Sequence, residues 1–225
     1  MKSLSSLLIA SAMIATASAA SANVVIAGWT MPTAVAAATT GTNYSYGAAD
    51  FGALVSGSML SGTHSSASTA WSSPAGNGST YALSSNGWNV GDYYQISLAT
   101  TGYSDVRVYW DQTRSSTGPA GFETVLSVDG GSTFSSLGSY SYTVNQVSWN
   151  ATTPSTTSSF GTVATAADNQ ANVIIRFKVV TAGTSTTTGT NRIDNISVTG
   201  TVVPVPSPGA IALVGLAGLV ARRRR

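Results

Sequence analysis

The sequence has no cysteine and few residues that could carry out catalysis. Thiol nucleophiles, thiolate zinc sites and disulfide bonds are therefore excluded. The single histidine, His64, lies in a stretch rich in Ser, Gly and Thr, and no Gly-x-Ser-x-Gly motif surrounds a serine elsewhere. A Ser-His-Asp triad would need this histidine as its base. We expect His64 instead to be a solvated loop residue.

Charged residues make up only 8% of the chain, and Glu123 is its only glutamate. Glu123 alternates with Phe122 and Thr124, which places it on the solvent-facing side of a strand. Glycoside hydrolysis would need a second carboxylate, such as that of Asp111, about 5 to 9.5 Å away. Nothing in the sequence brings these two carboxylates together. We therefore expect no catalytic residue and no enzymatic activity, and a secreted glycan hydrolase is the least favoured function.

The C-terminal segment 204–225 combines a short proline motif, an apolar run and a basic end. As a helix, the 13 residues of the run, 209–221, would span about 20 Å. That length is short of the ~30 Å hydrocarbon core, so we expect only transient insertion, with the basic end in the cytoplasm and the rest exported. The motif is Pro206, Ser207 and Pro208, and the basic end is Arg222, Arg223, Arg224 and Arg225.

This tail resembles the PEP-CTERM sorting signal, which is read by the bacterial membrane protease exosortase. The family pattern is Pro-Glu-Pro, an apolar stretch and a basic terminus, and Ser207 stands here in place of the glutamate. Residues 204–206 form an alternative triplet, but 206–208 directly precedes the apolar run. The resemblance implies processing by an exosortase-type protease and delivery to the cell surface or extracellular space. It covers only the tail and implies no activity for the rest of the chain.

The N-terminus has the features of a secretory signal peptide over residues 1–22. Lys2 supplies a positive start, residues 4–15 are mostly apolar, and Ala20 and Ala22 form a small-residue cleavage site. We expect cleavage after Ala22, which makes Asn23 the first mature residue.

The net charge of the chain without its two terminal segments differs in sign from that of the full sequence. These segments contain five of the ten basic residues and none of the eight acidic ones, so their removal changes the net charge from +2 to −3. Nucleic-acid binding requires a clustered basic face, and the processed chain has none in its sequence.

Residues 23–203 are predicted to form one all-β domain. Apolar residues alternate with polar ones in four short segments separated by Gly, Asn, Asp and Ser, which is typical of half-buried strands. We therefore expect an antiparallel β-sandwich, most closely a jelly roll. Longer loops are expected around 57–78, 113–121, 151–168 and 183–189. The inward positions are Tyr94, Ile96 and Leu98; Val106, Val108 and Trp110; Phe122, Thr124, Leu126 and Val128; and Val173, Ile175, Phe177 and Val179.

One turn has a recognisable sequence. Residues 127–134 follow the pattern Ser-x-Asp-x-Gly-x-Thr-aromatic and resemble the Asp-box hairpin of sialidase-like propellers. A propeller would repeat this turn at a fixed period, and the chain contains one copy. We therefore expect a structural role for it.

Asp194 falls on the core-facing side of a predicted strand, together with Ile196 and Val198. A buried carboxylate needs compensation, which could come from Arg192, from backbone amides at a bulge or from calcium, which prefers oxygen ligands. The segment 193–196 resembles the last strand of jelly-roll carbohydrate-binding and adhesion domains, where such an aspartate holds structural calcium. Calcium is therefore the one cofactor that this resemblance implies.

Aromatic residues offer a second possible ligand surface, because exposed rings can stack on sugars. Tyr93 and Tyr109 face away from the core by strand parity, whereas Trp71, Trp88 and Trp149 are expected to pack inside. Two functions remain open: a structural or adhesive surface protein, or a carbohydrate-binding module whose partner is a polysaccharide.

Overall fold

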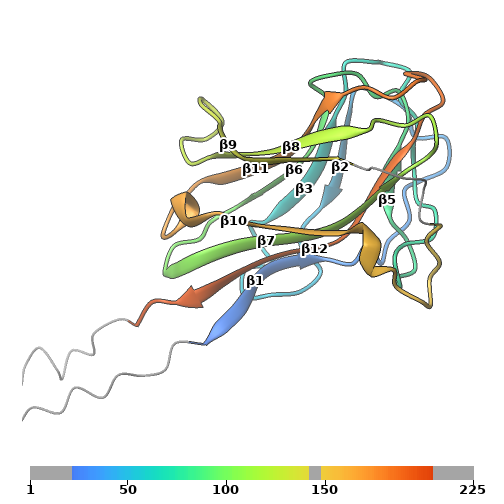
Figure 1. Cartoon of the computed structure of the whole chain (residues 1–225). Coiled ribbons are helices and arrows are strands. Elements are labelled where there is room, and N and C mark those ends of the chain that lie inside the picture. The colour runs from blue at the N-terminus through green and yellow to red at the C-terminus, as the bar shows by residue number, and fades with distance from the viewer. Residues whose placement is uncertain (1–21, 142–147, 205–225) are drawn as a thin grey trace, which may run out of the picture.

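The computed structural model describes residues 22–141 and 148–204, which form two facing β-sheets (Figure 1). The first sheet contains β1 (Asn23–Trp29), β4 (Trp71–Ser72), β5 (Leu83–Ser85), β7 (Tyr103–Arg114), β10 (Ser159–Val163) and β12 (Asn191–Val202). The second contains β2 (Asn43–Gly47), β3 (Met59–Thr63), β6 (Tyr93–Leu98), β8 (Gly121–Ser127), β9 (Ser135–Ser141) and β11 (Val173–Thr181). Two short 3-10 turns, η1 (Thr156–Ser158) and η2 (Thr165–Ala167), flank β10.

The two sheets have simple neighbour orders, and their strands pair antiparallel throughout the described residues. The first sheet runs β10-β7-β12-β5-β4, with β1 also bonded to β12, and the second runs β2-β3-β6-β11-β8-β9. The predicted antiparallel β-sandwich is therefore confirmed. The longest ladder joins β7 and β12, two strands of twelve residues each.

Alternation positions the core as the sequence predicts. Inward side chains of β6, β7, β8 and β11 meet between the sheets, where they lose nearly all contact with solvent. Val128 is the exception among the predicted inward residues, because β8 ends at Ser127 and Val128 begins the following turn with 40% of its surface exposed. Aromatic rings fill much of this core, and the three tryptophans that we expected inside, Trp71, Trp88 and Trp149, are buried.

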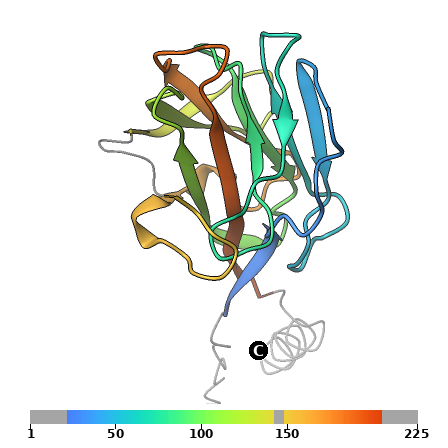
Figure 2. The same ribbon diagram turned by 90° about the vertical axis from the view of Figure 1, so that its right-hand side faces the viewer.

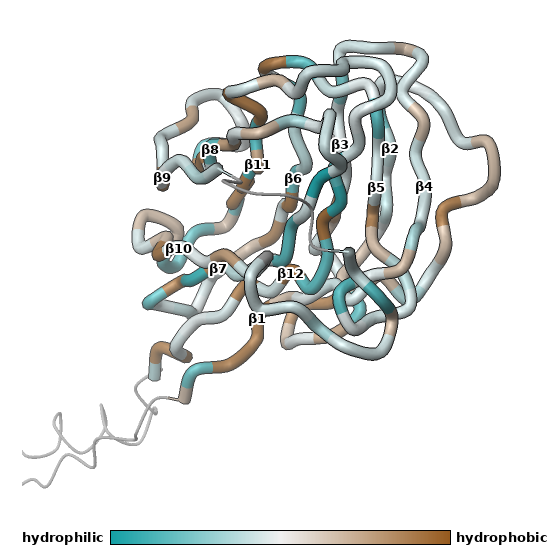
Figure 3. Tube along the Cα trace, turned by 45° about the vertical axis from the view of Figure 1, so that its right-hand side comes forward, coloured by the Kyte–Doolittle hydropathy of each residue, from teal (hydrophilic) through white to brown (hydrophobic). Residues whose placement is uncertain are grey.

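Three strands lie where loops were expected. β3 and β4 fall within 57–78, and β10 falls within 151–168. Their sequences are rich in Ser, Thr and Gly, whose hydropathy is close to neutral, so alternation along them gives little contrast. Figure 3 shows the same effect, since long stretches of the chain are pale and strong colour is confined to scattered positions.

The turn between β8 and β9 has the structural role expected of its Asp-box sequence. The Asp129 carboxylate accepts hydrogen bonds from the Thr133 hydroxyl at 2.6 Å, the Thr133 amide at 3.0 Å and the Ser127 hydroxyl at 2.7 Å. These bonds hold the pKa of Asp129 well below its ordinary value. Gly130 and Gly131 both have positive φ, 73° and 94°, which only glycine adopts without strain.

The two described ends of the chain lie side by side. Asn23 of β1 is the register partner of Thr201 of β12, and both strands leave the sandwich at the same end (Figure 2). Among the described residues, no helix has the length and apolar character needed to cross a bilayer. The predicted signal peptide, with Ala20, lies almost wholly outside the described residues, as do Pro206 to Pro208 and Arg222 to Arg225 of the tail.

Candidate functional site

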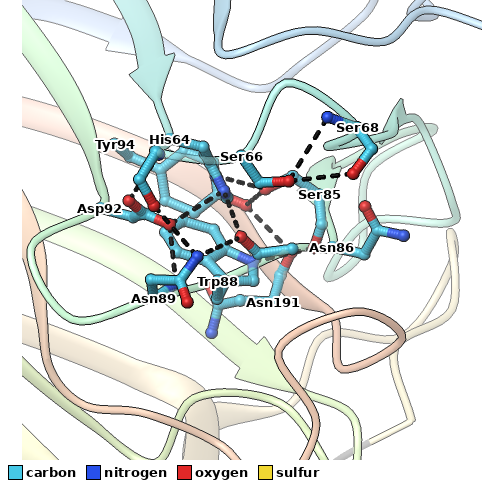
Figure 4. Close-up of polar contacts among 12 residues, drawn as sticks. His64, Ser66, Ser68, Ser85, Asn86, Trp88, Asn89, Asp92, Tyr94 and Asn191 are labelled. Carbon is cyan, nitrogen blue, oxygen red and sulfur yellow. Dashed lines mark hydrogen bonds and ion pairs between the residues drawn. The ribbon is translucent and has the colours of Figure 1, made fainter.

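His64 is not a solvated loop residue, and the expectation from its sequence context is wrong. The residue is 3% exposed, and its side chain lies between the rings of Trp71 and Trp88, with ring centroids 4.9 and 4.1 Å away. Its imidazole contacts two polar side chains, Ser85 of β5 and Asp92 (Figure 4). The structure therefore assembles a serine, a histidine and an aspartate that lie up to 28 residues apart.

The hydrogen bonds of this cluster fix the histidine tautomer. His64 Nδ1 lies 3.3 Å from the carbonyl oxygen of Gly87 and 3.4 Å from Asp92 Oδ2, and both atoms are acceptors. Nδ1 must therefore carry the proton, and Nε2 accepts from the Ser85 hydroxyl at 3.1 Å. Burial lowers the pKa of His64 from its ordinary value of 6.5, and the charge of Asp92 opposes that shift only in part. The imidazole is neutral at neutral pH.

This order of contacts is that of a catalytic triad, but the cluster is sealed inside the protein. Ser85 and Asp92 are buried like the histidine, and the Ser85 hydroxyl also lies 3.4 Å from the hydroxyl of Tyr94. Asp92 is held by the backbone amides of Ser65 and Asn89, at 2.8 and 2.7 Å. No substrate can reach Ser85 Oγ without opening the core, so the cluster joins two loops to the sheet.

Asp194 sits in a second buried polar cluster, but not on the core-facing side that strand parity predicts. Its register partner Asp111 alternates with the core residue Trp110, so both carboxylates lie on the outer face of the first sheet, beneath the loop around Asn77. Asp194 is 0% exposed, and β12 has a register irregularity between Asp194 and Ser197, where Asn195 has a φ of 46°. Its carboxylate accepts from the amides of Asn77 and Asn195, at 2.7 and 2.8 Å, and from the Ser79 hydroxyl at 2.6 Å. Of the partners considered from the sequence, backbone amides at a bulge are those that the structure provides.

Asp111 of β7 completes this cluster from the neighbouring strand. It is the register partner of Asp194, and its carboxylate accepts from the side-chain amides of Asn77 and Asn195, both at 2.8 Å, and from the Ser159 hydroxyl at 2.5 Å. Burial raises the pKa of Asp194 to about 6, and the nearby charge of Asp111 adds to that shift. The cluster thus ties the loop around Asn77 and the start of β10 at Ser159 to the central strands.

The donors in this cluster do not fit calcium. Asn77 Oδ1 accepts from the Ser155 amide at 2.6 Å, which forces Asn77 Nδ2 toward Asp111. Asn195 Nδ2 likewise donates to the carbonyl of Asn77 at 2.8 Å. N–H and O–H groups therefore occupy the positions around both carboxylates that a cation would need. Over 22–141 and 148–204, no group of three His, Cys, Asp or Glu side chains could hold a metal ion.

Asp111 and Glu123 do not form a catalytic pair. Asp111 belongs to β7 in the first sheet, whereas Glu123 belongs to β8 in the second. Glu123 Oε2 lies 3.1 Å from Lys178 Nζ, and a hydrogen bond from Ser136 and this lysine lower its pKa. Glu123 is therefore a paired surface carboxylate, as its parity predicts.

Of the two tyrosines predicted to face outward, Tyr93 is covered. The guanidinium carbon of Arg176 lies 4.1 Å from the centroid of its ring and also 4.1 Å from that of Phe134. Arg176 Nε donates to Gln95 Oε1 at 2.8 Å, which holds the guanidinium in place. The face of Tyr93 is thus occupied by a cation and is not free for a ligand.

Tyr109, in contrast, is 42% exposed and lines an open groove of ≈ 510 Å³ beside the edge strand β10. The ring lies over Gly161, its register partner on β10. A smaller hollow of ≈ 120 Å³ adjoins the groove, and the two have three residues in common. The groove is lined by Arg107, Tyr109, Leu137, Gly161, Thr162 and Val163.

Sequence reasoning found Tyr109 and Asp194 but missed what surrounds them. Parity gave the outward direction of Tyr109, because the alternation in β7 is strong, but it gave the wrong face for Asp194, because β12 has a bulge after that residue. The contacts of Asn77, Ser85 and Gly161 depend on pairings between distant segments, and no local pattern in the sequence reports them. The sequence contains a weak indication for Asp92, because a single aspartate just before a buried strand often accepts hydrogen bonds from nearby backbone amides.

Comparison with known proteins finds no matching family model and no matching curated protein. Among solved structures, the K1 cleaved adhesin domain of Lys-gingipain from Porphyromonas gingivalis is similar over 76% of this chain and 95% of that one, with a TM-score of 0.43 and 12% identity. The K2 cleaved adhesin domain of Lys-gingipain is similar over 76% of this chain and 96% of that one, with a TM-score of 0.41 and 10% identity. Likeness at this level transfers no function to the chain.

Proposed function

We propose that this chain is a non-enzymatic surface or extracellular-matrix protein whose β-sandwich has a structural or adhesive role. Export would begin with the N-terminal signal peptide, and the PEP-CTERM-like tail would be processed by an exosortase-type protease. The body between them would be a jelly-roll-like sandwich. The chain order supports that description, because consecutive strands pass repeatedly from one sheet to the other.

The observation that carries the proposal is the burial of the Ser85–His64–Asp92 cluster. Histidine is the side chain whose ordinary pKa lies near neutral pH. His64 is the only histidine of the chain, and it is buried where a substrate cannot reach it. Asp111 and Glu123, the acidic pair considered for glycoside hydrolysis, belong to different sheets, and the neighbouring carboxylates of Asp111 and Asp194 are buried. What the described surface offers is a rigid, weakly charged sandwich, which suits a scaffold or an adhesive unit.

The test is to follow the full-length protein in the cell that produces it. Mass spectrometry of its termini should give Asn23 as the first residue and a C-terminus near 206–208, and the protein should be found at the surface or in the extracellular matrix. Deleting the gene should weaken cohesion of the matrix. An intact Met1, or an intracellular protein, would overturn the proposal.

A carbohydrate-binding module is the second candidate, and one observation favours it. Tyr109 presents an exposed ring at an open groove, next to polar side chains. An aromatic ring of this kind can stack on the apolar face of a sugar. Binding to a polysaccharide would also give the adhesive role a molecular partner.

A further inference from the structure

We propose that the outer face of β7 binds a neutral polysaccharide chain, with one sugar ring stacked on Tyr109 and sugar hydroxyls bound by Arg107 and Asp105. This inference rests on the carbohydrate-binding candidate and names its ligand class and contact residues. All three side chains are exposed on one strand. Arg107 and Tyr109 follow one another at about 6.6 to 6.8 Å, and Asp105 precedes them at a bulge, where its φ is 51° and the register with β12 shifts. They form a row along the strand.

The ring of Tyr109 packs against Gly161, its neighbour on β10. A Cβ atom at Gly161 would come within 2.8 Å of Tyr109 Cδ1 and 3.1 Å of Cε1, so the ring occupies the place where any other residue would carry a side chain. The Cδ1–Cε1 edge of the ring therefore packs against the backbone of β10, and 42% of the residue is exposed to solvent. On its second side Tyr109 pairs with Ser197 of β12, a small residue that leaves the ring open.

Arg107 and Asp105 are available for a ligand. Both side chains are exposed, and neither has a hydrogen-bond or ion-pair partner within the described ranges 22–141 and 148–204. Arg107 also lines the groove, where its register partners are Val163 on β10 and Thr199 on β12. The guanidinium supplies donors and the carboxylate supplies acceptors. Sugar hydroxyls, which both donate and accept, match this combination.

The charges of the row favour a neutral chain over an acidic one. Arg107 would attract a uronate, but Asp105, two residues earlier on the same strand, would repel it. The processed chain is also expected to carry a net charge of −3. A neutral glycan is repelled by neither side chain, because its hydroxyls carry no charge and form hydrogen bonds with both.

The experiment measures retardation of the full-length protein, in mild detergent, on native gels that contain soluble β-glucan, mannan or alginate. Tyr109→Ala should weaken retardation by a neutral glycan about tenfold, and Tyr109→Phe, which keeps the ring, should bind like the unmodified protein. Gly161→Ala should weaken binding without removing any ligand contact, because the new methyl group displaces the ring. Added salt should have little effect.

The matched control is Phe51→Ala. Phe51 is exposed to the same degree, 40%, and its ring also lies over a glycine, Gly28, but Phe51 does not line this groove. This variant should bind like the unmodified protein, and the melting temperature of each variant reports whether it is folded.

Equal weakening by Phe51→Ala and Tyr109→Ala would overturn the inference, as would salt-sensitive retardation by alginate alone. Absence of retardation on every glycan would also overturn it. The surface location and matrix cohesion of the protein are measured separately in cells, so a failure of glycan binding is distinguishable from a failure of the proposed surface role.

Discussion

Replacing Asn77 with alanine should destabilise the protein by about 4 kcal/mol. The lost side chain donates to Asp111 at 2.8 Å and to the Ser155 carbonyl at 2.9 Å, and it accepts from the Ser155 amide at 2.6 Å. A bond to a charged group contributes about 1.5 to 3 kcal/mol and each neutral bond about 0.5 to 1.5 kcal/mol. The backbone bonds of residue 77 to Asp194 and Asn195 survive the substitution, which limits the loss to these three bonds.

The assay is urea unfolding followed by tryptophan fluorescence, with a thermal scan alongside it. A loss of this size should lower the melting temperature by about 8 to 16 °C for a domain of this length. Asn43→Ala is the control, since Asn43 is exposed and its side chain donates only to the neighbouring Thr42, at 3.1 Å. It should change stability by less than about 0.5 kcal/mol. If Asn77→Ala costs less than about 1 kcal/mol, the buried cluster does not hold the loops as described.

Three further results are expected. Burial lowers the pKa of His64 below 6.5, so below that pH the unfolded chain binds more protons than the folded protein. Stability should therefore fall as the pH drops from about 7 to 5. His64→Gln should flatten this dependence, and an unchanged slope in that variant would contradict the assignment to His64. The raised pKa of Asp194, about 6, has the opposite effect on stability as the pH falls. Asp194 is present in both the unmodified protein and His64→Gln, so the difference between their pH profiles reports the histidine alone. Calcium and chelators should leave the melting temperature unchanged, and stabilisation by calcium would show that the donors around Asp111 and Asp194 rearrange. Gly76→Ala should cost about 1 to 3 kcal/mol in urea unfolding, because its new Cβ would meet Asp194 and lie 2.5 Å from the Tyr81 carbonyl oxygen; an unchanged stability would refute this packing.

Strong hydropathy contrast decided which strands could be predicted. In β11, Ile175, Phe177 and Val179 alternate with the charged residues Arg176 and Lys178, and both the strand and its inward face follow from that pattern. In β10, the sequence from Ser159 to Val163 contains Ser, Gly and Thr, so the strand looks like a loop until its pairing with β7 is known.

The same limit explains the error at His64. Its flanking residues are small and polar, which is typical of a solvated loop, but its burial comes from Trp71, Trp88 and Asp92, which lie 7, 24 and 28 residues further along the chain. At Asp194 the local contrast is misleading, because the bulge in β12 between Asp194 and Ser197 reverses the alternation that Ile196 and Val198 set. Local sequence thus predicts the direction of a side chain within an uninterrupted strand, whereas bulges and the partners of a side chain depend on the topology.

The pairing of β12 with β7 has a mechanical consequence for a tethered protein. β12 ends at Val202, next to Tyr103 at the start of β7, and the proposed tail follows from that end. If the tail holds the protein and a ligand pulls at Tyr109, the two strands are drawn in opposite directions along their length. Their hydrogen bonds lie perpendicular to the strands, so the bonds between the two attachment points share the force together and do not open one after another. The sandwich would then resist pulling much better than its melting temperature suggests.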